Sequence, residues 1–443
     1  MSESIKVGIV SLGCPKNQCD SELMLARIAE AGFKIVAEAG LADVVIINTC
    51  GFIQSAKEEA IEEIMEAINR KNDGINKKII VTGCLAQRYK EQMDEEFPEV
   101  DCVLGLGGEK DIVEAINTVM LDRRLISVGA PEEHTMEGGR IISTLPHYAY
   151  LRVADGCDNC CSYCAIPFIR GYFRSRKIED LVKEAEFLVS RGVREIILVA
   201  QDTTRYGEDL YGRLALPELL NELCKVDGIK WIRLLYCYPE RITDELIQTM
   251  KKQEKVLPYM DIPIQHCNKD ILRAMNRSGS EQELWDLIAR LRRELPEIII
   301  RTTLITGFPG ETEDQFTELA EFVNSVKFDR LGCFAYSEEE GTVAAEMPYQ
   351  VDQAEREHRA EIIMEQQDVR QQEFCEEQKG KTFEVVVEGY DRYFEMYFGR
   401  SYMYAPEIDG MIYFKGKGLQ IGNFVNVKIT DAVDNNLIGE TVR

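Results

Sequence analysis

Short apolar runs alternate with amphipathic stretches along the first third of the chain. The runs that predict strands occur at 6–13, 42–49 and 77–83. The amphipathic stretches that predict helices occupy 21–32, 55–70 and 111–120. This alternation predicts a parallel, doubly wound α/β sheet. The glycine pair at 138–139 is the expected boundary of an N-terminal domain, 1–138.

A second alternating series begins near His147. Its predicted strands are 148–154, 194–200, 231–236, 258–264, 298–305 and 330–336, with helices at 178–192 and 281–295. Six strand–helix units predict a partial or full TIM-like (β/α)6 barrel, with its chemistry at the C-terminal ends of the strands. A long charged helix is expected at 353–378. The central domain is predicted to span 139–375.

The pattern changes again near the C-terminus. Short alternating runs separated by turn residues occur at 382–390, 410–416, 423–430 and 436–442. Such runs predict a small antiparallel β-barrel as a third domain, 376–443.

The charge balance restricts the class of partner. The 443-residue chain has 52 basic and 77 acidic residues, a formal charge of −25. Nucleic-acid binders usually carry a basic surface, so a basic partner is favoured, although a local basic patch stays compatible with RNA. No apolar run reaches the ~18 residues of a membrane span, and the N-terminus lacks a signal-peptide pattern. A cytoplasmic location is expected, where fourteen cysteines do not indicate a disulfide framework.

Three N-terminal cysteines share one local setting. Cys14, Cys50 and Cys84 each follow a predicted parallel strand and have a glycine beside them. The strand ends of an open α/β sheet lie on one edge, where ligands bind, so the three thiolates could hold an iron–sulfur cluster with one iron free. Three buried cysteines in unrelated turns are the alternative that spacing leaves open. Cys19 and Cys102 lack this setting and are expected to pack in the core.

Four further cysteines lie close together in "CDNCCSYC", at 157, 160, 161 and 164. Two overlapping CxxC units could bind zinc, but zinc ribbons separate such pairs by about 15–20 residues, and the chain has only four histidines. The other interpretation is CxxxCxxC, made by Cys157, Cys161 and Cys164 after a predicted first barrel strand. Cys160 is then predicted to be dispensable.

The CxxxCxxC motif, with Tyr163 directly before its last cysteine, resembles the radical S-adenosylmethionine (SAM) superfamily. The resemblance implies that Cys157, Cys161 and Cys164 bind a [4Fe–4S] cluster whose fourth iron chelates SAM. One electron then yields a 5′-deoxyadenosyl radical that abstracts hydrogen from an unactivated carbon.

Other candidate cofactor-binding residues lie at predicted strand ends or in the basic segment "RGYFRSRK". Arg170, Arg174 or Arg176 could pair with the methionine carboxylate of SAM, with a solvated basic loop as the alternative. The remaining candidates, which end strands or begin the glycine-rich segment "GFPGET", are Tyr163, Gln201, Asp202, Gln265, Arg301 and Gly307. His266 lies beside one of them and is more typical of a satisfied polar residue than of a ligand.

Both cysteine sets, followed by a small β-barrel, resemble the methylthiotransferases across all three domains. The resemblance implies an auxiliary [4Fe–4S] cluster on Cys14, Cys50 and Cys84 that carries the inserted sulfur, a radical core and a C-terminal TRAM domain. One SAM supplies the methyl group and another the radical. The family more often has another residue where this chain has Cys160.

The family has a branch that modifies tRNA adenosine and one that modifies an aspartate of the twelfth small-subunit ribosomal protein. "SLGCPKNQCDSE", "INTCGFIQSAKEEAI" and "GRSYMYAPEIDG" are similar to the protein-modifying branch; the tRNA branch tends to Cys-Gln-Met-Asn where this chain has Cys-Pro-Lys-Asn. The segment 381–443 has nine acidic and seven basic residues, whereas an RNA-binding barrel is expected to be basic. Glu407 and Asp409 could meet a basic ribosomal protein, with a solvated turn as the alternative.

The expected activity is therefore replacement of a β-carbon hydrogen of aspartate by a methylthio group. The expected partners are the ribosomal protein and an electron donor such as flavodoxin or ferredoxin, with no membrane, no stable nucleic-acid complex and a monomeric chain. The same chemistry on tRNA and an iron–sulfur electron carrier are the alternatives. A carrier is disfavoured because clusters that only carry electrons are usually fully ligated by protein.

Overall fold

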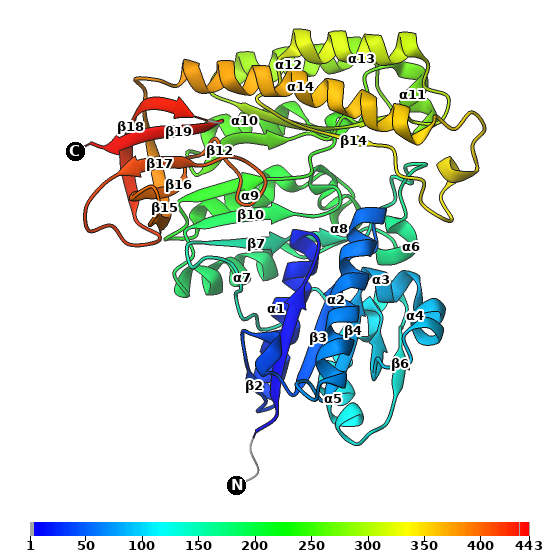
Figure 1. Cartoon of the computed structure of the whole chain (residues 1–443). Helices are drawn as coiled ribbons and strands as arrows, with labels where there is room; N and C mark the ends of the chain where they lie inside the picture. The colour runs from blue at the N-terminus through cyan, green and yellow to red at the C-terminus, as the bar shows by residue number, and fades with distance from the viewer. Residues whose placement is uncertain (1–3, 434, 443) are drawn as a thin grey trace. The chain divides into compact units, whose positions relative to one another are not determined.

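The computed structural model describes residues 4–433 and 435–442 (Figure 1). The chain forms two compact units, which are described separately below. Unit 1 is made of Met1–Ser143, Ala154–Arg174 and Ser337–Ala345. Unit 2 is made of Thr144–Val153, Ser175–Tyr336 and Glu346–Arg443. Both sets of cysteines discussed above therefore belong to unit 1.

Unit 1 is built on a six-stranded parallel sheet with the order β2-β1-β3-β4-β5-β6. The strands are β1 (Lys6–Ser11), β2 (Lys34–Ile35), β3 (Val44–Thr49), β4 (Lys78–Gly83), β5 (Cys102–Leu104) and β6 (Leu125–Ser127). The α-helices are α1 (Pro15–Glu30), α2 (Gln54–Asn72), α3 (Cys84–Arg88), α4 (Lys90–Glu96), α5 (Ile112–Met120) and α6 (Ile166–Arg170). Short 3-10 helices η1 (Ala39–Leu41), η2 (Leu106–Asp111) and η3 (Pro131–Glu133) connect them.

Helices cover both faces of this sheet, as the alternating pattern predicted. One apolar core joins α1 and α5 to the sheet, and it includes Met24 and Ile116. The core on the opposite face joins α2, α3 and α4, and it includes Ile64 and Met93. The three predicted strands and three predicted helices are confirmed, while β2, β5 and β6 are too short to have produced a distinct apolar run.

Unit 2 contains a second six-stranded parallel sheet, in which each strand pairs with the next along the chain, from β7 to β10 through β14. The strands are β7 (Tyr148–Arg152), β10 (Glu195–Val199), β11 (Trp231–Leu234), β12 (Val256–Asp261), β13 (Ile299–Thr306) and β14 (Arg330–Ala335). This sequential order is that of a partial (β/α)6 barrel, and all six predicted strands are confirmed.

Helices follow most of these strands. The α-helices are α7 (Ile178–Ser190), α8 (Glu208–Tyr211), α9 (Leu216–Lys225), α10 (Asp244–Lys252), α11 (Lys269–Ala274), α12 (Glu281–Glu294), α13 (Glu313–Val326) and α14 (Gln353–Glu377). The 3-10 helices of unit 2 are η4 (Thr203–Arg205) and η5 (Pro239–Arg241). Three short elements lie in unit 1 or at its limits: β8 (Ala154–Asp155), β9 (Arg174–Ser175), which pairs with β8, and the 3-10 helix η6 (Val343–Glu346). The long charged helix predicted at 353–378 is α14.

The C-terminal part of unit 2 is a closed barrel with the strand order β15-β16-β17-β19-β18. Its strands are β15 (Thr382–Asp391), β16 (Met396–Arg400), β17 (Ile412–Lys415), β18 (Phe424–Val433) and β19 (Asn436–Thr441). Four pairings are antiparallel, as expected, and the β17–β19 pairing is parallel. The sequence pattern missed β16.

The segment 400–410 of this barrel packs into the N-terminal end of the central sheet. Arg400 donates to the carboxylate of Glu195, the first residue of β10, at 2.8 Å. The carboxylate of Glu407 accepts a hydrogen bond from Tyr148 at 3.1 Å, and that of Asp409 accepts one from Tyr259 at 2.7 Å. Glu407 nevertheless stays exposed and Asp409 is half-buried, so the contact of these two carboxylates with a basic partner stays a prediction.

Within residues 4–433 and 435–442, every helix is too short or too polar to span a lipid bilayer.

Candidate functional site

Cys14, Cys50 and Cys84 lie at the C-terminal ends of three adjacent strands of unit 1. Cys14 follows β1, Cys50 comes directly after β3, and Cys84 comes directly after β4, while β3 pairs with both β1 and β4. Helix α1 lies on one face of the sheet and α2 on the other. The chain therefore changes face between β1 and β3, and ligands bind at such a switch point in open α/β sheets.

The three cysteine-bearing turns touch one another through glycines. A Cβ atom on Gly13, whose φ is +86°, would lie 2.7 Å from the Cβ of Cys50. A Cβ atom on Gly51 would lie 3.0 Å from the carbonyl carbon of Cys84. These glycines allow the turns to approach each other closely, so the sequence-distant thiols gather at one place.

Charges around these thiols favour an anionic form at Cys14. Burial raises the pKa of the Cys14 thiol, but the charges of Lys16 and Arg170 and nearby backbone amides outweigh it and hold the pKa below its ordinary value. Cys14 also precedes α1, whose positive N-terminus faces it. Burial raises the pKa of Cys50 and of Cys84, and neighbouring thiols raise both further. Mutual effects of this kind are expected where three sulfur atoms lie close together.

The second cysteine set lies in the loop between β8 and α6. Cys157 and Cys161 are buried, and Cys164 is half-buried with a pKa raised by burial and then by Cys161. Cys160 is the exposed member, and its backbone has a φ of +48°. Exposure thus distinguishes Cys160 from the other three, although it is close enough to raise the pKa of Cys164, and the CxxxCxxC ligand set stays a prediction. Tyr163 is half-buried in this loop.

Arg170, at the end of α6, is directed to the first cysteine set. Its guanidinium donates to Asp155 at 3.2 Å and to Asp20 at 2.8 Å, and one of its nitrogens lies 3.7 Å from the Sγ of Cys84. Asn17 accepts a further hydrogen bond from it at 3.1 Å. The charge of Arg170 is thus held by carboxylates of unit 1, and the suggestion that it pairs with a methionine carboxylate has no support from this geometry.

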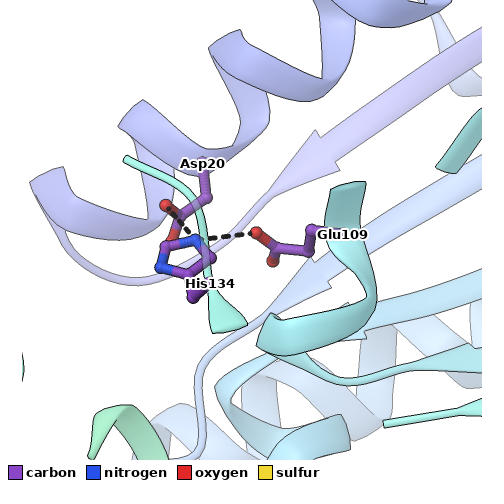
Figure 2. A group of neighbouring side chains, drawn as sticks. All are labelled: Asp20, Glu109 and His134. Atoms are coloured by element: carbon purple, nitrogen blue, oxygen red, sulfur yellow. Dashed lines mark hydrogen bonds and ion pairs between the residues drawn. The ribbon is translucent and has the colours of Figure 1, made fainter. Parts of the chain in front are cut away.

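A buried histidine completes this network (Figure 2). His134 Nδ1 lies 2.9 Å from Asp155, and Nε2 lies 3.1 Å from both Asp20 and Glu109. Burial alone lowers the pKa of His134, but the three carboxylates outweigh it and raise the pKa to about 10. A pKa of about 10 makes His134 an imidazolium at neutral pH, which bridges the carboxylates. The ligand atoms of Asp20, Glu109 and His134 also lie within 4.8 Å of one another.

The sequence analysis did not identify this network. Its members are Asn17, Asp20, Glu109, His134, Asp155 and Arg170. They come from α1, η2, the 3-10 turn at η3, β8 and α6, so no fixed spacing relates them. The only hint in the sequence was the closeness of some members to the cysteines. Asn17 and Asp20 lie one and two helical turns after Cys14, and Asp155 lies two residues before Cys157.

The other two arginines of the basic segment have local partners. Arg174 donates to the backbone carbonyls of Tyr172 at 3.0 Å and Pro131 at 3.3 Å. Arg176, in unit 2, donates to the carbonyl of Arg152 and forms an ion pair with Glu184 at 2.6 Å. A role for Arg174 in cofactor binding stays a prediction.

Gln201 and Gln265 of unit 2 lie just beyond the C-terminal ends of β10 and β12, where they were expected. Gln265 has a φ of +69° and donates its backbone N–H to Thr303 at 2.9 Å. No donor among the described residues reaches its buried Oε1 atom. A strained backbone and an unsatisfied buried oxygen are both costly, and they mark Gln265 as a residue available to a ligand.

Asp202 and Arg301 have structural partners. The carboxylate of Asp202 caps η4 and accepts a hydrogen bond from Arg241 at 2.9 Å. Arg301 lies in the N-terminal part of β13 rather than at its end, and its guanidinium donates to Asp261 at 3.0 Å. Both charges are therefore balanced inside unit 2, and their roles in cofactor binding stay predictions.

Gly307 follows β13 with a φ of +69°. A Cβ atom there would lie 2.7 Å from the Cβ of Arg356 on α14, so the glycine is needed for helix packing. Its N–H donates to the buried carboxylate of Glu311, which also accepts from Arg359 and lies 3.5 Å from His266. Packing against α14 therefore explains this glycine structurally, and a contact of Gly307 with SAM stays a prediction.

The donor set of unit 1 fits iron–sulfur clusters. Each cysteine set offers three sulfur donors, which leaves one iron of a [4Fe–4S] cluster open to a non-protein ligand. The cationic Arg170 and Lys16 beside the first set complement the negative charge of a thiolate-bound cluster. In unit 2, the unsatisfied Gln265 fits a polar ligand of the kind that SAM provides.

Three family models match the chain in order. They are the uncharacterized protein family UPF0004 at residues 6–105, the radical SAM superfamily at 151–323 and the TRAM domain at 380–442. Among solved structures, the radical SAM methyltransferase TsrM from Kitasatospora setae aligns with a TM-score of 0.55 at 15% identity, covering 75% of this chain and 74% of that one. The cobalamin-dependent SAM radical enzyme OxsB aligns with a TM-score of 0.53 at 13% identity, covering 82% and 56%. These likenesses support the fold.

Whole-chain relatives give the family. A protein from Clostridium botulinum (strain Hall) named ribosomal protein uS12 methylthiotransferase RimO is 48% identical over 439 residues, 99% of this chain and 98% of the relative. A Thermoanaerobacter protein of the same name is 47% identical over 98% of this chain and 99% of the relative. Both cysteine sets lie in one compact unit, and the TRAM barrel follows the radical SAM core along the chain. The chain therefore belongs to the ribosomal protein uS12 methylthiotransferase family of radical SAM enzymes.

Proposed function

We propose that this protein replaces a β-carbon hydrogen of an aspartate in ribosomal protein uS12 with a methylthio group. The observation that carries the proposal is the pair of three-cysteine sites, Cys14/Cys50/Cys84 and Cys157/Cys161/Cys164, within one compact unit. Each site leaves one iron open, which suits chemistry at the cluster better than electron transfer alone. Relatives with this name at 46–48% identity support the substrate class.

Each group of residues has a distinct role in this proposal. Cys157, Cys161 and Cys164 hold the cluster that, together with SAM, supplies the radical chemistry when bound. Cys14, Cys50 and Cys84 hold a second cluster whose open iron presents the sulfur to be inserted. Gln265, with its unsatisfied buried amide oxygen, orients SAM by accepting a hydrogen bond from it. Tyr163, Arg174, Gln201, Asp202, Arg301 and Gly307 remain our further candidates for contacts with SAM.

The reaction defines the co-reactants. The C–H bond of the aspartate breaks and a C–S bond forms; the hydrogen leaves with the adenosyl part of one SAM, and a second SAM gives its methyl group to the sulfur. The step also needs a sulfur source and a one-electron donor such as flavodoxin or ferredoxin.

We propose that the enzyme works as a monomer in the cytoplasm, without a stable nucleic-acid complex, and that its domains are 1–138, 139–375 and 376–443. The formal charge of −25 supports a basic protein partner.

The test combines metal content with product mass. Anaerobically reconstituted enzyme is expected to hold about eight irons, and the Cys14→Ala and Cys157→Ala variants are each expected to lose roughly half. Incubation with SAM, sulfide and a reductant, with uS12 or tRNA offered separately, should add a methylthio mass to uS12. A mass gain on tRNA alone would overturn the protein substrate, and about four irons in the parent enzyme would remove one of the two clusters.

A further inference from the structure

We propose that Arg170 is a positioning residue of the auxiliary cluster, whose guanidinium donates to Cys84 and raises the reduction potential of that cluster. The proposal rests on the proposed function, because it requires a cluster on Cys14, Cys50 and Cys84. It gives Arg170, in the segment after the CxxxCxxC motif, a role at the other cysteine site.

The geometry aims Arg170 at the first cysteine set. Arg170 is 1% exposed and lies six residues after Cys164, at the end of α6. Helix α6 packs on α3, and Ile169 shares an apolar cluster with Cys84. Its Nη2 atom lies 3.7 Å from the Sγ of Cys84, within reach of a hydrogen bond to sulfur.

Asn17 connects this guanidinium to all three cysteine turns. Its Nδ2 donates to the carbonyl of Leu12 at 2.9 Å, two residues before Cys14, and to that of Thr49 at 2.9 Å, one residue before Cys50. Its Oδ1 accepts from Arg170 at 3.1 Å and lies 3.7 Å from the Sγ of Cys84. Because a cluster-bound Cys84 has no S–H proton, Arg170 is then the group of this pair that donates to the sulfur.

The surrounding carboxylates fix Arg170 in place. Asp155 accepts from its Nη1 and Asp20 from its Nη2, and His134 contacts both of these carboxylates. Figure 2 shows the contact of His134 with Asp20. His134 and Arg170 together face three carboxylates, Asp20, Glu109 and Asp155, and burial raises the pKa of the Glu109 carboxyl. The guanidinium therefore cannot swing away without leaving buried carboxylates unpaired.

A fixed cation beside a cluster sulfur favours the reduced cluster, which carries one more negative charge. Hydrogen bonds to sulfur and local charge are the protein's main means of setting cluster potentials. Arg170 could instead serve only to neutralise Asp20 and Asp155. That structural role predicts altered stability with an unchanged potential, so the potential distinguishes the two roles.

The test isolates the auxiliary cluster in the full-length chain. In the parent variant C157A/C161A/C164A, about four irons are expected, and their midpoint potential is measured by a redox titration followed by electron paramagnetic resonance. Adding Arg170→Gln is expected to lower the equilibrium constant for one-electron reduction about tenfold, which corresponds to ~59 mV. Arg170→Lys, which keeps the charge, should change it by less than about threefold.

Arg140→Gln is the matched control. Arg140 is also buried in unit 1, pairs with Glu22 at 3.0 Å and lies 3.6 Å from the Sγ of Cys19, a cysteine outside both sets. This variant should leave the potential unchanged. If Arg170→Gln fails to hold iron, the double variant R170Q/D20N is tested instead, because it removes the charge of Arg170 together with that of its partner Asp20. A lowered reduction potential is again expected, since the hydrogen-bond donor to Cys84 is absent.

Two results overturn the inference in distinguishable ways. An iron-bearing Arg170 variant without the guanidinium that titrates at the parent's potential contradicts the role of Arg170 alone. A parent variant that binds no cluster iron contradicts the second cluster, and with it both the proposed function and this inference.

Discussion

The buried carboxylate of Glu195 allows a quantitative prediction about how the TRAM barrel is attached to the central sheet. Glu195 accepts hydrogen bonds from Arg233 and Arg400, both at 2.8 Å, and is fully buried. Burial raises its pKa, but the two guanidinium groups outweigh this effect and lower the pKa from 4.5 to about 2. A difference of about 2.5 units corresponds to ~3 kcal/mol of folding stability at neutral pH.

Glu195→Gln keeps the side-chain size and removes the charge. Because it leaves the buried Arg233 without its carboxylate partner and Arg400 with Glu388 alone, we expect it to lower the free energy of unfolding by about 3–5 kcal/mol. Urea unfolding at pH 7 can be followed by the fluorescence of Trp231, whose ring lies 4.9 Å from that of Phe424 in the barrel. Glu384→Gln is the control, since its pair with Lys230 is exposed on both sides and should cost less than about 1 kcal/mol.

The pH dependence gives a second test of the same reasoning. A carboxylate with a depressed pKa stabilises the fold above its unfolded pKa of 4.5, and this contribution is lost as the pH falls towards 2. The parent and Glu195→Gln should therefore converge in stability across this window. If Glu195→Gln costs no more than Glu384→Gln at pH 7, or if the difference persists at pH 2, the account of this ion network is wrong.

Three other outcomes are expected in unit 1. Gly13→Ala should lose about four irons, because the added Cβ would lie 2.7 Å from the Cβ of Cys50. Gly32→Ala, at the same φ of +86° but with open space around it, should keep these irons. Equal iron loss in the two variants would contradict the packing argument. Cys160→Ala should retain the iron content and activity of the parent, as measured by iron assay and product mass, and loss of either would change the ligand set. The charged His134 should stabilise the fold fully below pH 6.5, and this contribution should be lost as the pH rises through about 10. The urea unfolding midpoints of the parent and His134→Gln should therefore approach each other over that range. A constant difference between the midpoints would mean that His134 is neutral in the folded protein.

Local pattern was sufficient for the elements with long apolar runs. The strand β3, which is fully buried, and β4, which is buried after Lys78, stand out as continuous hydrophobic runs, and α14 stands out as a long polar helix. The positions of these elements therefore followed from the sequence. The three-residue strands β5 and β6 give no periodic signal. Their place in the sheet comes from pairing with β4 and with each other, which is tertiary information.

Charged residues were the hardest to assign. Asp409 and Arg301 looked like a surface acid and a cofactor ligand, but the structure places their charges 3.8 Å apart. Arg170 looked interchangeable with Arg174 and Arg176, yet it is the one that reaches a cysteine of the other set. The role of a charged side chain depends on its partner, and the partner is often distant in the sequence. Asp409 lies more than a hundred positions after Arg301. Arg170 reaches Cys84 only because α6 packs against α3.

The sequence could predict that Cys14, Cys50 and Cys84 lie on one edge of the sheet, because this prediction does not depend on the order of the strands. Every parallel strand of an open sheet ends on the same edge, so a cysteine after each of three strands is delivered to that edge whatever the order. Actual convergence required more: β3 had to lie between β1 and β4, and the turns after them had to be thin enough to touch. Gly13 and Gly51 provided the second condition in the sequence itself, whereas the first came only from the fold. The same reasoning explains why Asn17 escaped notice, since an amide that donates to the carbonyls before Cys14 and Cys50 gains that role only once β1 and β3 are neighbours.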